Sequence, residues 1–276
     1  MSLKATPPKD MAPKDMAPEH LTPEDMGNRL LYRDGLMLII NKPAGLAVHK
    51  GPKGGASLED YFDALRFGLP RMPALAHRLD KETSGCLVLG RHRKALADHN
   101  DLFRYGKVGK TYWAVVEGGP VEPEGRIELP LGRLDGKIGW WMKHDPDGLP
   151  SQSTWRVMGR VEGTTAPLTW LALEPLTGRT HQLRVHCAES GFPVLGDNIY
   201  GTAPRHGGPR LHLHAREITV PLYKNKPPIK VTAPVPEHMK ERLKACGWNE
   251  DDDKQLPPPL GLSSRARTDE RAPKPQ

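Results

Sequence analysis

Short apolar segments separated by hairpin-length spacings restrict the fold of this 276-residue chain more than any other feature. Each spans about four to ten residues, which suits strands better than helices. The run Leu36–Ile40, for example, is stopped by Asn41, Lys42 and Pro43. These segments predict an α+β domain with a mixed, mostly antiparallel sheet and flanking helices. The further segments are residues 86–89, 111–116, 126–131, 153–158, 168–174 and 211–220.

Helix signals are fewer and lie between these segments. Ser57 followed three residues later by Asp60 resembles a capping box and predicts a helix over residues 58–67. Because strands outnumber helices, alternating βαβ units are not expected. Further helices are expected at residues 94–104 and 236–246.

The two ends of the chain differ in composition from the body. Residues 1–28 contain many prolines and a crude repeat, and residues 250–276 are rich in proline and polar side chains. Such segments bury too little apolar surface to offset the entropy of ordering. We therefore expect disordered tails at 1–28 and 250–276. Between them, residues 29–249 should form one domain that is large enough for an enzyme.

Net charge is concentrated in the body. Residues 1–28 carry three lysines and five acidic residues, and residues 250–276 carry five basic and six acidic residues. The formal charge of the whole chain is +7, so residues 29–249 must carry +10. A basic body suits a polyanionic partner such as RNA, although many basic domains bind no nucleic acid.

Cysteine usage favours a reducing compartment. Cys86, Cys187 and Cys246 lie far apart, and no CxxC pair occurs. An odd, scattered set argues against a disulfide framework, so we expect a cytoplasmic protein. No apolar run approaches the ~20 residues of a membrane span, so no membrane partner is expected.

The densest group of reactive side chains is residues 76–85, just before a predicted strand. There Asp80 lies among Arg78, Lys81 and Thr83. Nearby cations favour an ionised carboxylate, which can act as a nucleophile or base if it faces a cleft. An ordinary ion pair in a loop is the simpler interpretation from composition alone.

A second dense segment covers residues 175–186. Gly178 permits a sharp turn, which places Arg179 beside the start of a helix that carries Leu183. A helix N-terminus with an arginine beside it attracts anions. Arg179 could hold a phosphate, pair with Asp80, or be a surface arginine at a helix cap.

The histidines do not form a metal motif. His181 and His186 lack the four-residue separation of a helical zinc pair, and no HExxH occurs. His212 and His214 share one strand face, but no third ligand lies at a suitable spacing. We expect no metal site.

A third segment offers a stacking surface. Tyr112 and Trp113 are consecutive in a predicted strand and therefore face opposite sides of the sheet. One can pack in the core while the other lines a cleft, where an aromatic ring can stack on a nucleobase. Packing of both rings in the core is equally compatible with the strand.

Taken in order, these segments resemble the RluA family of pseudouridine synthases from about Leu30 to about Val220. A run of motifs of this length and order is highly specific. The motifs that carry the resemblance are His77-Arg78-Leu79-Asp80 with Thr83-Ser84-Gly85, Lys42 to Val48, Lys110 to Ala114, Thr177 to His186, Gly196 to Gly201, and Leu213 to Ala215.

The resemblance implies a pseudouridine synthase fold with a central RNA-binding cleft, and an isomerase that converts a specific uridine of structured RNA, rRNA or tRNA, into pseudouridine. Asp80 would be the catalytic carboxylate, Arg179 would pair with it, and Tyr112 would stack on the uracil. No cofactor is implied, and we expect a monomer. The substrate-binding residues would be His77, Arg78, Thr83, Leu183 and Arg184.

The chain departs from many relatives at its N-terminus, and its basic body and its histidines leave two other functions open. Many relatives carry an N-terminal RNA-binding domain of the S4 type, whereas residues 1–28 form only the Pro-rich segment. A catalytically silent RNA-binding or assembly factor that kept the fold is the main alternative. A metal hydrolase built on the histidines is the weaker one.

Overall fold

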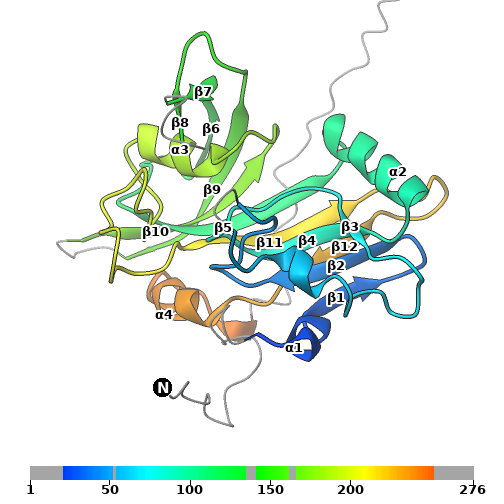
Figure 1. Cartoon of the computed structure of the whole chain (residues 1–276). Coiled ribbons are helices and arrows are strands. Elements are labelled where there is room, and N and C mark those ends of the chain that lie inside the picture. Colours follow the sequence, from blue (N-terminus) through cyan, green and yellow to red (C-terminus); the bar gives the residue numbers. More distant parts are fainter. Residues whose placement is uncertain (1–20, 52–53, 135–140, 162–165, 252–276) are drawn as a thin grey trace, which may run out of the picture.

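The computed structural model describes residues 21–51, 54–134, 141–161 and 166–251, which form a mixed α and β structure (Figure 1). The strands are β1 Leu30–Arg33, β2 Met37–Lys42, β3 Ala74–Leu75, β4 Ser84–Gly90, β5 Gly109–Glu117, β6 Glu124–Glu128, β7 Leu131–Arg133, β8 Met142–His144, β9 Gln152–Val161, β10 Leu168–Pro175, β11 Leu213–Val220 and β12 Ile229–Thr232. The helices are α1 Pro23–Gly27, the short 3-10 helix η3 Leu58–Tyr61, α2 Arg93–Arg104, α3 Gln182–Glu189 and α4 Glu237–Ala245.

A ten-stranded sheet organises the molecule in the order β1-β2-β4-β11-β5-β10-β9-β6, with β3 paired to β4 and β12 to β11. Among the described strands only β4 and β11 pair in parallel. Gly85 makes their close approach possible, because a Cβ at this position would clash with the carbonyl oxygen of Ala215. The pairing brings the start of β4, which directly follows the Asp80 loop, to the centre of the sheet.

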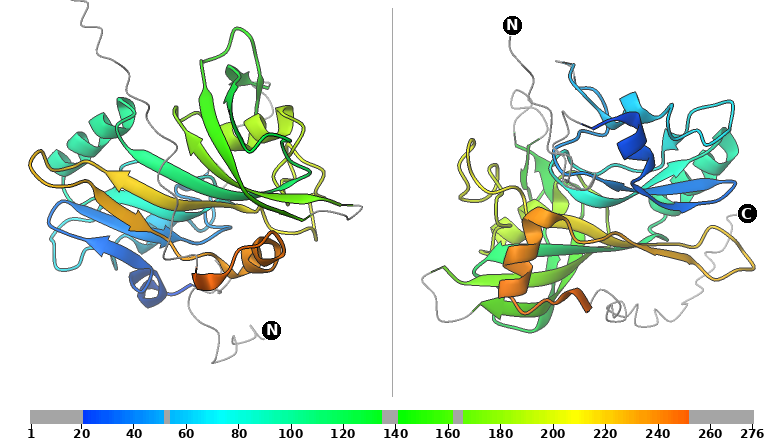
Figure 2. Two further views of the ribbon diagram at one scale, coloured as in Figure 1. Left: turned by 180° about the vertical axis from the view of Figure 1, so that it is seen from behind. Right: turned by 90° about the horizontal axis from the view of Figure 1, so that it is seen from below.

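Successive side chains of a strand point to opposite faces of the sheet. In the central strands, different helices cover these two faces. Trp113 and Val115 of β5 pack in one cluster with residues of α4. Ala114 and Val116 pack in another cluster with residues of α3. Figures 1 and 2 accordingly show α3 and α4 on opposite sides of β5 and β10. The predicted α+β class with a mostly antiparallel sheet and flanking helices is confirmed.

Two predicted elements differ from the structure. The helix expected over residues 58–67 is only η3, although Asp60 does accept a hydrogen bond from the backbone N–H of Ser57. Beyond η3 the chain continues in short-range turns that bury Phe62 and Leu65. The strand expected over 126–131 is divided into β6 and β7. Pro130 stands between them and has no N–H to continue the ladder.

The N-terminal tail was predicted too long. Residues 1–20 lie outside the described ranges, but Thr22 caps α1 in a capping box with Asp25. Leu21 and Met26 are buried in the core. The proline content of this segment predicted disorder. The cap and the burial of these two apolar side chains explain why it is ordered instead. Of the C-terminal tail expected at 250–276, only the first two residues are described.

Candidate active site

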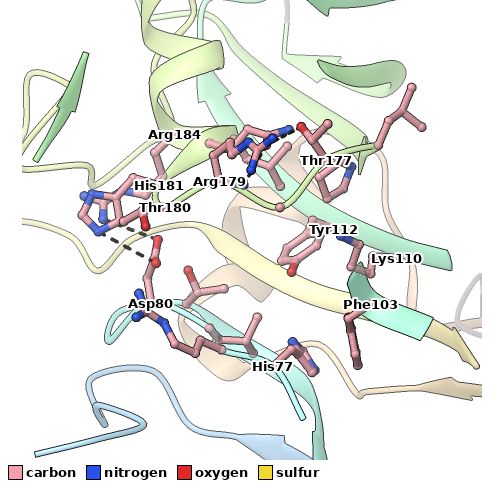
Figure 3. A pocket seen from close by; sticks show the side chains of 18 of the residues that line it. His77, Asp80, Phe103, Lys110, Tyr112, Thr177, Arg179, Thr180, His181 and Arg184 are labelled. Carbon is pink, nitrogen blue, oxygen red and sulfur yellow. Dashed lines mark hydrogen bonds and ion pairs between the residues drawn. The ribbon is translucent and has the colours of Figure 1, made fainter. Parts of the chain in front are cut away.

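A cavity of about 780 Å³ opens between the end of α2, strand β5, the loop before β4 and the turn that leads into α3 (Figure 3). All eight site residues expected from the sequence line this one cavity, although the first and the last are more than 100 residues apart in the chain. They are His77, Arg78, Asp80, Thr83, Tyr112, Arg179, Leu183 and Arg184.

Asp80 projects into the cavity from the loop before β4, with 22% of its side chain exposed. Its Oδ2 lies 3.8 Å from the guanidinium of Arg184, and its Oδ1 lies 3.8 Å from Nε2 of His181. Figure 3 shows both contacts at one side of the cavity. The carboxylate is thus partly open to a ligand and countered by a cation.

Arg184 is held rigidly by a second carboxylate. Its Nε and Nη2 donate to the two carboxylate oxygens of Asp197, both at 2.7 Å. The side chain of Asp197 is fully buried and also accepts from the backbone N–H groups of Ile199 and Tyr200. Burial acts to lower the pKa of Arg184, but the hydrogen bond and charge of Asp197 outweigh it and the pKa is raised. A permanent cation therefore faces Asp80.

The expected pairing of Arg179 with Asp80 is wrong. Nε of Arg179 donates to the carbonyl oxygen of Pro150 at 3.2 Å, and its backbone N–H donates to Gln182. Arg184 takes the place beside Asp80 because it lies in the first turn of α3, where side chains point back toward the helix N-terminus and here into the cavity. Arg179 lines the cavity from the preceding turn.

Tyr112 and Trp113 point to opposite faces of the sheet, as the two-residue period of a strand predicts. Trp113 is buried and packs edge-on against Trp170. Tyr112 lines the cavity together with Lys110, which lies two residues earlier on the same strand. Burial raises the pKa of the Tyr112 phenol and lowers the pKa of Lys110 to about 8. The wall thus offers an aromatic ring and an amine to a bound group.

His77 supports the Asp80 loop from below. Its ring stacks on Phe103 of α2 at 4.4 Å, and its Nε2 accepts from the backbone N–H of Val88 at 3.0 Å. Burial lowers the pKa of His77 to about 3, so the ring is neutral and can accept that hydrogen bond. The loop is therefore tied to both α2 and β4.

Lys42 is a positioning residue whose role its Lys42–Val48 motif does not reveal. Its buried ammonium donates to the carbonyl oxygens of Pro43, Leu46 and Lys81, at 2.7 to 3.0 Å. Burial lowers its pKa to about 7, against the opposing charges of Glu82 and Asp80. Because Lys81 follows Asp80, the ammonium anchors the loop that carries the carboxylate.

Replacing Lys42 by methionine should lower the free energy of unfolding by about 2–4 kcal/mol, because buried carbonyls lose their donor. Urea unfolding followed by circular dichroism measures this. The matched control is Lys81→Met, a change at an exposed side chain on the same loop, which should shift stability by less than ~0.5 kcal/mol. Equal stability of the two variants would contradict an anchoring role for Lys42.

No three His, Cys, Asp or Glu side chains of the described ranges gather in a way that could hold a metal ion. No helix of the described residues is long and apolar enough to cross a membrane.

The geometry by itself defines a class of site. A carboxylate paired with a fixed guanidinium, an aromatic wall and a rim that carries arginines suit chemistry on an anionic ligand with a planar ring. Residues 36–189 match the family model described as RNA pseudouridylate synthase.

Individual relatives agree with the family model. An uncharacterized RNA pseudouridine synthase of Zymomonas mobilis is 40% identical over 77% of this chain and 95% of its own length. The ribosomal large subunit pseudouridine synthase C of Vibrio vulnificus is 33% identical over 79% of this chain and 69% of its own length. The solved structure of human RNA pseudouridylate synthase domain containing 4 has a TM-score of 0.66 at 26% identity, covering 80% and 95% of the two chains.

The chain belongs to the RNA pseudouridylate synthase family. It is an isomerase that acts on RNA, and the resemblance that its motifs indicated is confirmed.

Proposed function

We propose that this enzyme isomerises a uridine of ribosomal RNA and that Asp80 is its catalytic carboxylate. In this reaction the bond between N1 of uracil and C1′ breaks, a bond between C5 and C1′ forms, C5 loses its proton and N1 gains one. Attack by Asp80 on the target nucleotide divides this exchange into easier steps. The observation that carries the proposal is the Asp80–Arg184 contact inside a cavity that also holds Tyr112.

The cavity suits the binding of one nucleotide that is turned out of the RNA. A uridine stacked in RNA cannot be reached, so it must turn out into a pocket. Tyr112 would stack on the uracil, while Lys110, Arg78 and Arg179 would face the phosphates from the wall and rim. Leu183, Thr83 and His77 would shape the pocket around the base and ribose.

Ribosomal RNA is favoured over tRNA by the names of relatives such as the Vibrio enzyme. Three free cysteines, all buried, fit a cytoplasmic enzyme. We further propose that the protein works as a monomer, since one chain supplies every residue that lines the cavity.

Release of tritium from RNA labelled at C5 of uridine tests the proposal. Separate pools of unmodified rRNA and tRNA should be used, with the parent protein and Asp80→Ala. We expect release from rRNA with the parent only. Release from neither pool would favour the alternative of a non-catalytic RNA-binding or assembly factor.

Tyr105 should contact RNA next to the turned-out nucleotide. It follows the last residue of α2 on the cavity rim, and 67% of the residue is exposed. An exposed aromatic ring beside Arg104 and Lys107 suits stacking with a flanking base. Tyr105→Ala should raise KM for RNA about tenfold and leave kcat unchanged, because one stacking contact is worth ~1–3 kcal/mol.

Steady-state kinetics on rRNA fragments measure this effect. The control is Val121→Ala, which truncates an exposed side chain outside the cavity lining. A KM for Tyr105→Ala that matches the Val121→Ala value would remove Tyr105 from the RNA interface.

A further inference from the structure

Tyr200 connects the Asp80 site to strand β8 through its hydroxyl group. The hydroxyl oxygen accepts a hydrogen bond from the backbone N–H of Met142 at 2.9 Å. The same hydroxyl lies 2.7 Å from Nδ1 of His181, whose Nε2 lies 3.8 Å from Asp80. Neither Tyr200 nor His181 was among the site residues expected from the sequence.

The Met142 contact fixes the direction of one hydrogen bond at the Tyr200 hydroxyl and leaves its proton available for His181. The N–H of Met142 can only donate, so the oxygen of Tyr200 is the acceptor there. The hydroxyl proton is then free to be donated to Nδ1 of His181, which must be unprotonated to accept it. A neutral imidazole with a bare Nδ1 carries its proton on Nε2, and that nitrogen faces Asp80.

The neutral state of His181 agrees with its surroundings. Burial lowers its pKa, although the charge of Asp80 acts in the opposite direction. The other charged groups that act on it are Arg184 and Arg78, which lower the pKa, and Asp197, which raises it.

Tyr200 is itself fixed in place. Its ring lies 5.2 Å from the guanidinium of Arg184 and packs edge-on against the ring of His181 at 5.6 Å. Its backbone N–H donates to Asp197 at 3.0 Å. His181 has a left-handed backbone, with φ 52° and ψ 17°, which is uncommon for a residue other than glycine and is found at functional sites.

We propose that Tyr200 is a positioning residue for the isomerisation: it holds His181 in the neutral tautomer whose Nε2–H points at Asp80. The carboxylate then has a neutral donor facing one oxygen and the Arg184 guanidinium near the other. A separation of 3.8 Å exceeds hydrogen-bond reach, but catalytic hydrogen bonds often tighten only in the complex with substrate. This role rests on the proposed function of Asp80.

The tautomer can be read directly by nuclear magnetic resonance on protein labelled with ¹⁵N-histidine at neutral pH. Correlations between ring nitrogens and carbon-bound ring protons distinguish Nε2–H from Nδ1–H, and His181→Gln assigns the signals. We expect the Nε2–H form in the parent and a mixture of tautomers in Tyr200→Phe. The Nδ1–H form in the parent, or an unchanged spectrum in Tyr200→Phe, would overturn the proposal.

A double-mutant cycle tests whether Tyr200 acts through His181. Tyr200→Phe should lower kcat about tenfold without changing KM, because Asp80 then loses an oriented hydrogen-bond donor. Glutamine has no tautomers, so Tyr200→Phe should cost nothing more in the His181→Gln background. Costs that multiply would show that Tyr200 acts by another route.

Tyr223→Phe is the matched control, because it removes a tyrosine hydroxyl that donates to Asp34 away from the cavity. It should leave kcat unchanged; an equal loss in this variant would overturn the specific role of Tyr200. The spectrum does not depend on turnover. An active Asp80→Ala variant would therefore refute the proposed function while the tautomer is still measured independently.

Discussion

Asp80→Asn should abolish isomerisation, with kcat lower by at least about 1,000-fold, the scale seen when a nucleophile is removed. Asparagine has nearly the same shape, but it has no negative charge and cannot attack the target nucleotide. Affinity for RNA should stay within about threefold, because most of it comes from phosphate contacts. Single-turnover tritium release and filter binding on the same rRNA fragment measure the two quantities separately.

Glu82→Gln is the matched control for Asp80→Asn. It neutralises a carboxylate on the same loop that does not line the cavity. Its kcat should lie within about threefold of the parent, as expected for a site away from the reacting group. Equal losses in both variants would mean that the charge of the loop matters rather than the carboxylate of Asp80.

Arg184→Lys should lower kcat at least about 100-fold, whereas Arg179→Lys should change it less than about threefold. Lysine keeps the charge but cannot bind both oxygens of Asp197 and face Asp80 together. Nε of Arg179 donates to a backbone carbonyl, that of Pro150. Single-turnover rates of both variants, made by the same chemical change, provide the comparison.

The two arginines should also differ in stability. Arg184→Lys removes charge-assisted bonds to a fully buried carboxylate and should lower the free energy of unfolding by about 2 kcal/mol. Arg179→Lys should lower it by less than ~0.5 kcal/mol. A larger loss of kcat in Arg179→Lys than in Arg184→Lys would restore the pairing first expected from the sequence.

The order of the motifs along the chain predicts which residues line the cavity, but not which arginine lies beside Asp80. The sequence predicts a site made of Asp80, Tyr112 and the arginines of residues 177–186, and all of them line one cavity. Which arginine faces Asp80 depends on where α3 begins and on the direction of its first side chains. A linear motif does not contain that information.

Contacts between distant segments were the other part that the sequence could not predict. Lys42 binds a carbonyl 39 residues away, and Tyr200 binds Met142 58 residues away. Both residues belong to recognised motifs, but their roles appear only when the segments are packed together. The helix α1 was missed for a related reason, since its stability comes from burying Met26 in the core.

Pseudouridine mapping of total RNA tests the central claim most directly. Cells that lack this protein would be complemented with the parent or with Asp80→Asn at equal expression. The account predicts at least one rRNA uridine that is pseudouridine with the parent and unmodified with Asp80→Asn. Restoration of the same position by Asp80→Asn would contradict it.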